Sequence, residues 1–148
     1  MNLFKSNICL FVFVMSSLFI CQAQQLSLYN KNGEPTAYID FDRDGTLFNW
    51  DGTPMAFLKT DGEDNQVIGF NGRFLGWYEE GVLYDKQGRV IGQSKEHYFG
   101  VTRIEPIKSI QQIIPIKPIV IHIEFKPIFF NIWSSTSLGE FLYFGKKK

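Results

Sequence analysis

Four copies of a short unit constrain this chain more than any other feature of its sequence. Each copy places a polar residue and a Gly between two apolar segments. Such a dipeptide is typical of a two-residue β-hairpin, whose type I′ turn needs positive φ at both central residues. The units read LYNKNGEPTAY, LFNWDGTPMAF, VIGFNGRFLGW and LYDKQGRVIGQ, and their turn glycines are Gly33, Gly52, Gly72 and Gly88.

A two-residue turn fixes which residues of the two strands face each other, because partners can be counted outward from it. The count sets a large aliphatic residue opposite Ala or Gly in every unit. Ala and Gly are poor strand residues, so we expect another backbone or a bulky side chain to approach closely there. The predicted pairs are Leu28 with Ala37, Leu47 with Ala56, Val67 with Gly76, and Leu83 with Gly92.

The segments between the units carry further turn signals, at Asp44-Gly45, Asp61-Gly62 and Glu80-Gly81. The chain should therefore be all-β, with about eight short antiparallel strands arranged as four hairpins around a pseudo-fourfold axis. The turns between units should share one end and gather acidic residues into a single rim. Those residues are Asp40, Asp42, Asp44, Asp61, Glu63, Asp64, Glu79 and Glu80.

These residues resemble a known family, the four-fold beta-flower domain, over Leu28 to about Gln93. The segments that carry the resemblance are YNKNGEPTAYI, LFNWDGTPMAFL, FNGRFLGWYEEG and YDKQGRVIG, and the ending from Trp133 to Leu142 is similar to the family's WSSLS-type segment. The resemblance implies hairpins packed around a pseudo-fourfold axis, often followed by a Pro/Lys linker. It implies no assigned activity, so it bears on the fold rather than on function.

Residues 1–23 have the pattern of a secretory signal peptide, because Lys5 precedes an apolar run from Ile8 to Ile20. Cleavage before Gln24 predicts a secreted or periplasmic chain without cysteine. A lipoprotein cut before Cys21 is the alternative, although Ile20 is bulkier than that processing prefers. We then expect residues 24–100 to form the hairpin domain, 101–130 an extended Pro/Ile/Lys linker or docking segment, and 131–148 a short helix with a basic end.

The tail after Gly100 differs from the hairpin domain in charge and in periodicity. Residues 24–93 hold 11 acids and 6 bases, a net of −5, whereas residues 94–148 hold 4 acids and 8 bases, a net of +4. Isoleucines recur every third residue from Ile104 to Ile113 among prolines, a period that favours polyproline II. The segment should either dock on the hairpin domain or meet a partner. Ser137 and Glu140 form a capping-box pattern that predicts a short amphipathic helix.

Asp40, Asp42 and Asp44 precede Gly45 in a D-x-D-x-D-G pattern, which is the spacing of a calcium-binding loop. Alternate carboxylates beside a glycine turn supply oxygen ligands for such an ion. A soluble acidic turn between two strands explains the same residues. The pattern therefore makes these three aspartates candidate calcium ligands.

Aromatic residues recur in the units, and two readings of them stay open. They fill the core of a small β domain, or they line grooves between hairpins that bind a glycan or another small ligand through stacking and cation–π contacts. The residues are Tyr29, Tyr38, Phe48, Trp50, Phe57, Phe70, Phe74, Trp77, Tyr78 and Tyr84.

Catalysis has little support, because His97 and His122 lie outside the repeats and in no nucleophile or metal motif. We expect no enzyme activity, no cofactor and, from the acidic domain, no nucleic-acid binding. The sequence favours an exported interaction or scaffold module whose tail captures a protein partner or a second copy. It also predicts that the domain up to Gly100 folds without the tail, and that membrane contact is limited to the signal peptide.

Overall fold

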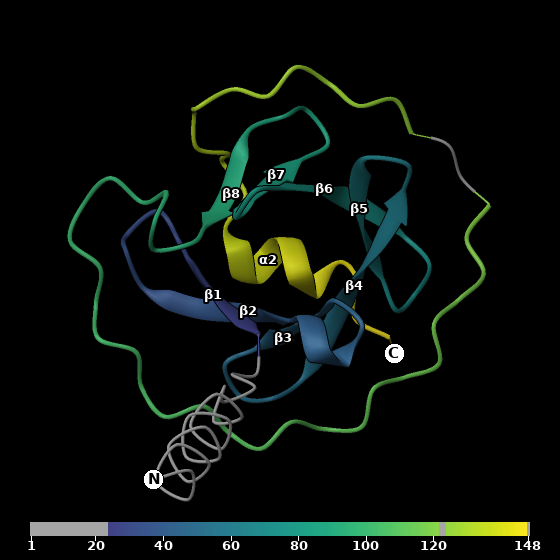
Figure 1. Cartoon of the computed structure of the whole chain (residues 1–148), viewed down its shortest axis with the longest axis horizontal. Coiled ribbons are helices and arrows are strands. Elements are labelled where there is room, and N and C mark those ends of the chain that lie inside the picture. The colour runs from purple at the N-terminus through teal and green to yellow at the C-terminus, as the bar shows by residue number, and fades with distance from the viewer. Residues whose placement is uncertain (1–23, 122–123, 148) are drawn as a thin grey trace, which may run out of the picture.

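A computed structural model describes residues 24–121 and 124–147, and within them eight antiparallel strands close into a barrel (Figure 1). Each strand pairs with the next along the chain, and Tyr29 pairs with Gln93 to close the circle. The all-β class and the four-hairpin order are confirmed. The elements are β1 (Gln25–Tyr29), β2 (Pro35–Asp40), the 3-10 helix η1 (Phe41–Arg43), β3 (Thr46–Asn49), β4 (Pro54–Asp61), β5 (Asp64–Gly69), β6 (Phe74–Glu79), β7 (Val82–Asp85), β8 (Val90–Gln93) and α2 (Leu138–Tyr143).

The turns inside the units do not have the predicted type I′ geometry. In the first unit the Gly33 N–H donates to the Asn30 carbonyl oxygen at 2.9 Å, and Gly33 has a φ of 74°. Asn32 has no positive φ, because Asp44 and Glu80 are the only non-glycine residues of the described chain that do. The unit is a type I turn followed by a left-handed glycine, which requires positive φ at one residue only. The same arrangement recurs at Gly52, Gly72 and Gly88.

All four predicted aliphatic pairs nevertheless occur, because two shifts of the strand register, in opposite directions, cancel. The three-residue loop shifts the pairing by one residue, and a β-bulge one step further shifts it back. The pairs of Leu28 with Ala37 and of Leu83 with Gly92 lie just beyond such bulges. The bulges leave one residue of each unit unpaired, namely Thr36, Met55, Leu75 and Ile91.

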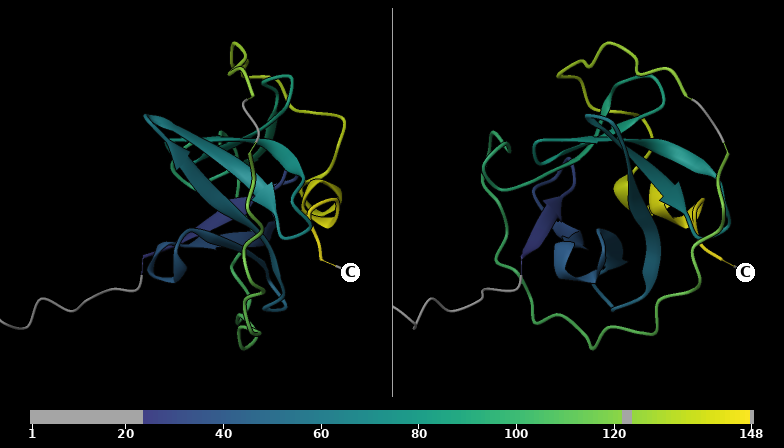
Figure 2. Two further views of the ribbon diagram at one scale, coloured as in Figure 1. Left: turned by 90° about the vertical axis from the view of Figure 1, so that its right-hand side faces the viewer. Right: turned by 45° about the vertical axis from the view of Figure 1, so that its right-hand side comes forward.

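The core on the barrel axis combines the repeated aliphatic residues with the C-terminal helix. Leu138, Phe141 and Leu142 of α2 belong to the same buried cluster as Leu28 and its three equivalents. Figures 1 and 2 show α2 lying across one end of the barrel, with η1 at the other end. The Ser137 hydroxyl accepts a hydrogen bond from the Glu140 N–H, so the predicted N-terminal cap of this helix is confirmed.

The two Gly positions opposite aliphatic residues, Gly76 and Gly92, are places of close approach, as predicted. A Cβ added to Gly76 would lie 2.0 Å from the Tyr84 carbonyl oxygen and 3.2 Å from the Phe141 ring. One added to Gly92 would lie 3.2 Å from the side chain of Leu138. The approaching groups are thus a neighbouring strand and α2, which makes the tail part of the core rather than an appendage.

Between β8 and α2, residues 94–121 and 124–133 run around the outside of the barrel, and we call them the belt (Figure 1). The belt carries no helix or strand in its described part, in agreement with the predicted extended segment. Its two ends meet where the Tyr98 ring lies 6.2 Å from the Trp133 ring. The predicted signal peptide, residues 1–23, and His122 lie outside the described residues.

Candidate interaction surfaces

The belt is itself a repeat, and this repeat matches the fourfold barrel. Residues 102–110, 111–119 and 120–128 read TRIEPIKSI, QQIIPIKPI and VIHIEFKPI, so Lys108, Lys117 and Lys126 are nine residues apart. At about three residues per turn, nine residues are three turns of an extended polyproline II helix. Each copy therefore places its lysine at an equivalent position around the barrel, and three faces of the belt can be described separately.

The first face points inward and fixes the belt to the barrel through its lysines. Each ammonium lies within 5.2 Å of an aromatic ring centre, which is cation–π distance. Lys126 also pairs with Asp64 at 2.8 Å and Glu79 at 2.9 Å, and Lys117 pairs with Asp44. The rings are Tyr38 and Trp50 under Lys108, Phe57 under Lys117, and Phe129 under Lys126.

Two carboxylates join this inward face to the first hairpin. Glu105 accepts from the Tyr29 hydroxyl at 2.8 Å, and burial together with that bond raises the pKa of Tyr29 to about 12. Asp40 accepts from the Gln111 and Gln25 side chains at 2.7 and 2.8 Å. Burial alone would raise the pKa of Asp40, but these hydrogen bonds outweigh it and hold the pKa below its ordinary value.

The second face supplies backbone donors to the hairpin turns. The N–H groups of Arg103, Gln112 and Phe130 donate to the carbonyl oxygens of Gly33, Gly52 and Gly88 at 2.8, 2.9 and 2.8 Å. Pro106, Pro115, Pro118 and Pro127 fall on this same face, at positions where no donor is required.

The third face points away from the barrel, and we call it the apolar ridge. Its side chains recur every third residue and are between 77% and 97% exposed. The inward face, which combines the lysines with Ile114, Val120 and Phe129, therefore contacts the barrel, whereas this third line of apolar side chains faces solvent. The ridge consists of Val101, Ile104, Ile107, Ile110, Ile113, Ile116, Ile119, Phe125 and Ile128.

The turns between units follow β2, β4 and β6 and lie at the end of the barrel that carries η1, where the candidate calcium ligands are used for other contacts. Asp40 caps η1 by accepting from the Arg43 N–H, and Asp42 accepts from the Gln24 N–H. Asp44 binds Lys117 of the belt. Within residues 24–121 and 124–147, no group of three or more His, Cys, Asp or Glu is arranged to hold a metal ion. The structure therefore gives no support to the predicted calcium site.

The aromatic residues serve mainly as packing, both inside the barrel and beneath the belt. Phe57, Ile68, Phe70, Phe74 and Trp77 form a second buried cluster, against which Phe129 of the belt packs. The Phe129 ring stacks on Tyr84 with 4.0 Å between centroids. Belt side chains thus lie over four of these aromatic residues, namely Tyr38, Trp50, Phe57 and Tyr84.

His97 contacts a hydroxyl, but this contact is part of a turn. Its Nδ1 lies 2.9 Å from the Ser94 Oγ, and Ser94 is 2% exposed, so the hydroxyl is closed to a substrate. The Ser94 carbonyl oxygen also accepts from the His97 and Tyr98 N–H groups. Separately, no helix within the described ranges is long and apolar enough to cross a bilayer.

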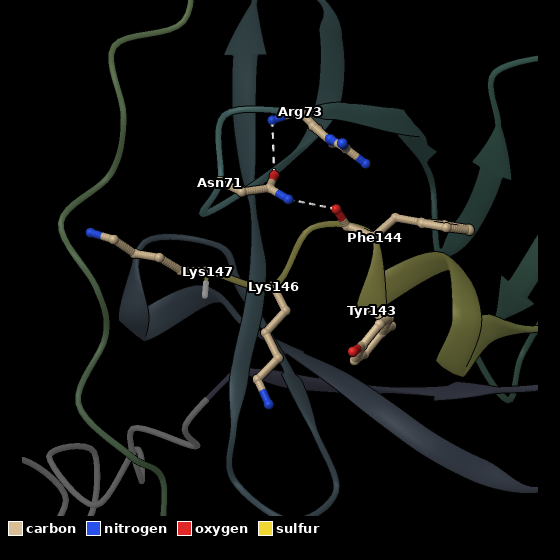
Figure 3. Close-up of a pocket in the computed structure, with 6 residues that line it drawn as sticks. All are labelled: Asn71, Arg73, Tyr143, Phe144, Lys146 and Lys147. Atoms are coloured by element: carbon tan, nitrogen blue, oxygen red, sulfur yellow. Dashed lines mark hydrogen bonds between the residues drawn. The ribbon is translucent and has the colours of Figure 1, made fainter.

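A cavity of about 660 Å³ lies beside the C-terminal end of α2, and we call it the basic pocket (Figure 3). The Asn71 amide bridges its two walls, because Nδ2 donates to the Phe144 carbonyl oxygen at 2.6 Å and Oδ1 accepts from the Arg73 N–H at 3.0 Å. Sequence reasoning missed this pocket, since its residues come from the third hairpin and from the chain end. It is lined by Asn71, Arg73, Tyr143, Phe144, Lys146 and Lys147.

Comparison with known proteins gives one match. A family described as 4-fold beta flower protein matches residues 26–142, which include the belt and most of α2 as well as the hairpins. No curated protein and no solved structure matches the chain.

Proposed function

This chain belongs to the 4-fold beta flower family, and from that premise we propose that it is an exported, non-enzymatic binding module whose contact surface is the apolar ridge. The family's description names a fold and no reaction. Export is proposed from the signal-peptide pattern of residues 1–23.

The observation that carries the proposal is the exposure of the ridge. Soluble monomers rarely expose contiguous apolar patches larger than a few hundred Å², and larger ones mark interaction sites. Here nine apolar side chains at three-residue intervals, seven from Val101 to Ile119 and then Phe125 and Ile128, face solvent, and Ile107 is 97% exposed. Isolated exposed isoleucines need no explanation, but a single line of them around the barrel does.

The ridge is also preorganised for binding. Its backbone is fixed by hydrogen bonds at Gly33, Gly52 and Gly88 and by the three lysines of the inward face. An ordered extended segment loses little conformational entropy when it binds, which is why polyproline II helices are common recognition elements. The partner that fits is a protein with apolar pockets spaced by one polyproline II turn, and a second copy of this chain is the other candidate.

The test replaces Ile107, Ile110 and Ile113 together with Thr. Threonine stays β-branched, so the backbone preference is kept while apolar surface is lost. Burying one isoleucine contributes roughly 1.5–3 kcal/mol, so losing three should weaken binding at least about tenfold. Sedimentation of the purified chain reports self-association, and capture from envelope extract reports other partners.

The matched control carries Val at the same three positions, which keeps the ridge apolar. Both variants should have the melting temperature of the wild-type protein, because these side chains are at least 93% exposed. Association that survives the threonine variant, or that is lost equally in the valine variant, would refute the ridge as the contact surface.

A further inference from the structure

We propose that the unpaired edge of β1 binds an extended peptide of a partner protein as an added strand, independently of the apolar ridge. The edge lies at the seam between β8 and β1 (Figure 1). Each of the other seams between hairpins is made by four or six residue pairs, whereas in the described chain this one is made by Tyr29 and Gln93 alone. The seam is therefore closed at one end and lacks a strand over the rest of its length.

The direction of the backbone groups shows which of them are open on β1. Successive residues of a strand offer their N–H and C=O groups to alternate sides. Tyr29 faces β8, with which it pairs, so Ser27 and Gln25 offer their groups to the same side. The opposite side agrees with this order, because the Gln24 carbonyl oxygen accepts there from a backbone N–H of the β2 side at 3.0 Å.

No strand reaches these groups, because the chain leaves the barrel after Ser94. Counting outward from the paired residues of the seam sets Lys95 opposite Ser27. Lys95 instead lies in a turn, in which the Ser94 carbonyl oxygen accepts from the His97 N–H at 3.1 Å. Among residues 24–121 and 124–147, no backbone hydrogen bond outside the β1–β2 ladder involves Gln25 or Ser27. Two donors and two acceptors are thus available, and such a strand edge is a template for an incoming strand.

The side chains beside the edge define the peptide that fits. Residues opposite each other on neighbouring strands lie on the same face of the sheet. Leu26 is half-buried against the core cluster on the barrel axis, so the peptide residue opposite it points inward and is apolar. The residues opposite Gln25 and Ser27 point outward and are polar. A cavity of about 300 Å³ adjoins the edge and can take the inward side chain; it is lined by Gln24, Gln25, Leu26, Phe41 and Tyr78.

Charge at the start of β1 favours a basic residue at one end of the peptide. Asp42 Oδ2 lies 3.1 Å from the Gln24 nitrogen, and Asp40 Oδ2 lies 2.8 Å from the Gln25 side-chain nitrogen. Asp42 is exposed, and the ion pairs of the described residues include none with it. A Lys or Arg opposite Gln24 would lie next to this carboxylate and complement its charge. The partner segment therefore reads polar, apolar, polar, basic, and runs antiparallel to β1 as β8 does.

The experiment titrates the ¹⁵N-labelled full chain with the peptide acetyl-Thr-Val-Thr-Lys-amide and follows the backbone amide signals. Saturable shifts should be largest at Gln25 and Ser27, and their N–H groups should exchange more slowly with solvent when the peptide is bound. The matched control is the same peptide N-methylated at both threonines. This peptide keeps every side chain but loses the backbone donors that face β1, so it should not bind.

Asp42→Asn keeps an acceptor for Gln24 and removes the charge. It should weaken binding of the lysine peptide about threefold and leave binding of a peptide with Gln in place of Lys unchanged. The ridge variant with Thr at positions 107, 110 and 113 should bind the peptide as the wild-type protein does, so failure of the ridge proposal and failure of this one are separate results.

Three results would overturn the proposal. They are equal binding of the N-methylated peptide, shifts confined to residues away from β1, and no saturable binding up to about 10 mM peptide.

Discussion

Phe141→Ala should strongly destabilise the whole protein, because α2 belongs to the barrel core. Phe141 is 4% exposed and packs in the same cluster as Leu28 and Val67. Truncating a buried phenylalanine to alanine costs about 3–5 kcal/mol, against a total stability of about 5–15 kcal/mol for a single domain. At a urea dependence of about 2 kcal/mol per molar, the midpoint should fall by roughly 1.5–2.5 M.

The assay is urea unfolding followed by far-ultraviolet circular dichroism. Tyr143→Ala is the control, since it removes a large aromatic side chain from the same helix at a position 68% exposed. Its free energy of unfolding should change by less than about 0.5 kcal/mol. If both variants unfold at the same urea concentration, α2 does not complete the core. A chain ended after Gly100 should fail to fold, in contrast to the expectation from sequence.

Three further outcomes follow from the contacts. Gly76→Ala should lower the free energy of unfolding in urea by about 2 kcal/mol or more, because its Cβ would lie 2.0 Å from a backbone carbonyl of β7. Gly92→Ala should lower it by about 1 kcal/mol or less, because its tightest contact is the end of the Leu138 side chain and the Tyr29 carbonyl oxygen lies at an ordinary 3.6 Å. The pKa of Asp40 in the folded protein lies below its ordinary 3.8, so the stability that the ionised carboxylate contributes is complete above pH 3.8 and is lost as the pH falls through the folded pKa. In Asp40→Asn the melting temperature should therefore fall less steeply with acid than in the wild-type protein. Gln112→Pro removes the N–H that donates to the Gly52 carbonyl oxygen, so the free energy of unfolding should fall by about 1 kcal/mol. Hydrogen exchange of the neighbouring belt amides should become faster.

The sequence predicts the hairpins well because their information is local. The turn glycines and the alternating apolar residues lie within a few positions of each other, so even the pairing of Val67 with Gly76 can be counted. The turn type was wrong because a loop and a bulge with opposite shifts give the same pairs beyond them. That ambiguity cannot be resolved from the strand residues alone.

The sites were harder to predict because they depend on contacts between distant segments. Nothing near Asn71 in sequence shows that it binds the Phe144 carbonyl, so the basic pocket was missed. Asp40 looked like a metal ligand because Gln111, its hydrogen-bond donor, lies 71 positions away. The extended form of the belt was predicted from its isoleucine period. Its path around the barrel was missed, although Lys108, Lys117 and Lys126, nine residues apart, were a signal for it.

The belt and the barrel are best understood as one cooperative unit, and this bears on the binding proposal. The only pairing that closes the barrel is Tyr29 with Gln93, so the seam between β1 and β8 is its weakest joint in the described chain. Tyr98 spans that seam, because its hydroxyl donates to the Lys31 carbonyl oxygen while its ring contacts Trp133. The belt therefore stabilises the closed barrel through Tyr98, and the barrel holds the belt extended through the hydrogen bonds at the turn glycines. A ridge held in this way keeps its three-residue spacing without a partner, and a flexible tail of the same composition would have to be ordered at the moment of binding.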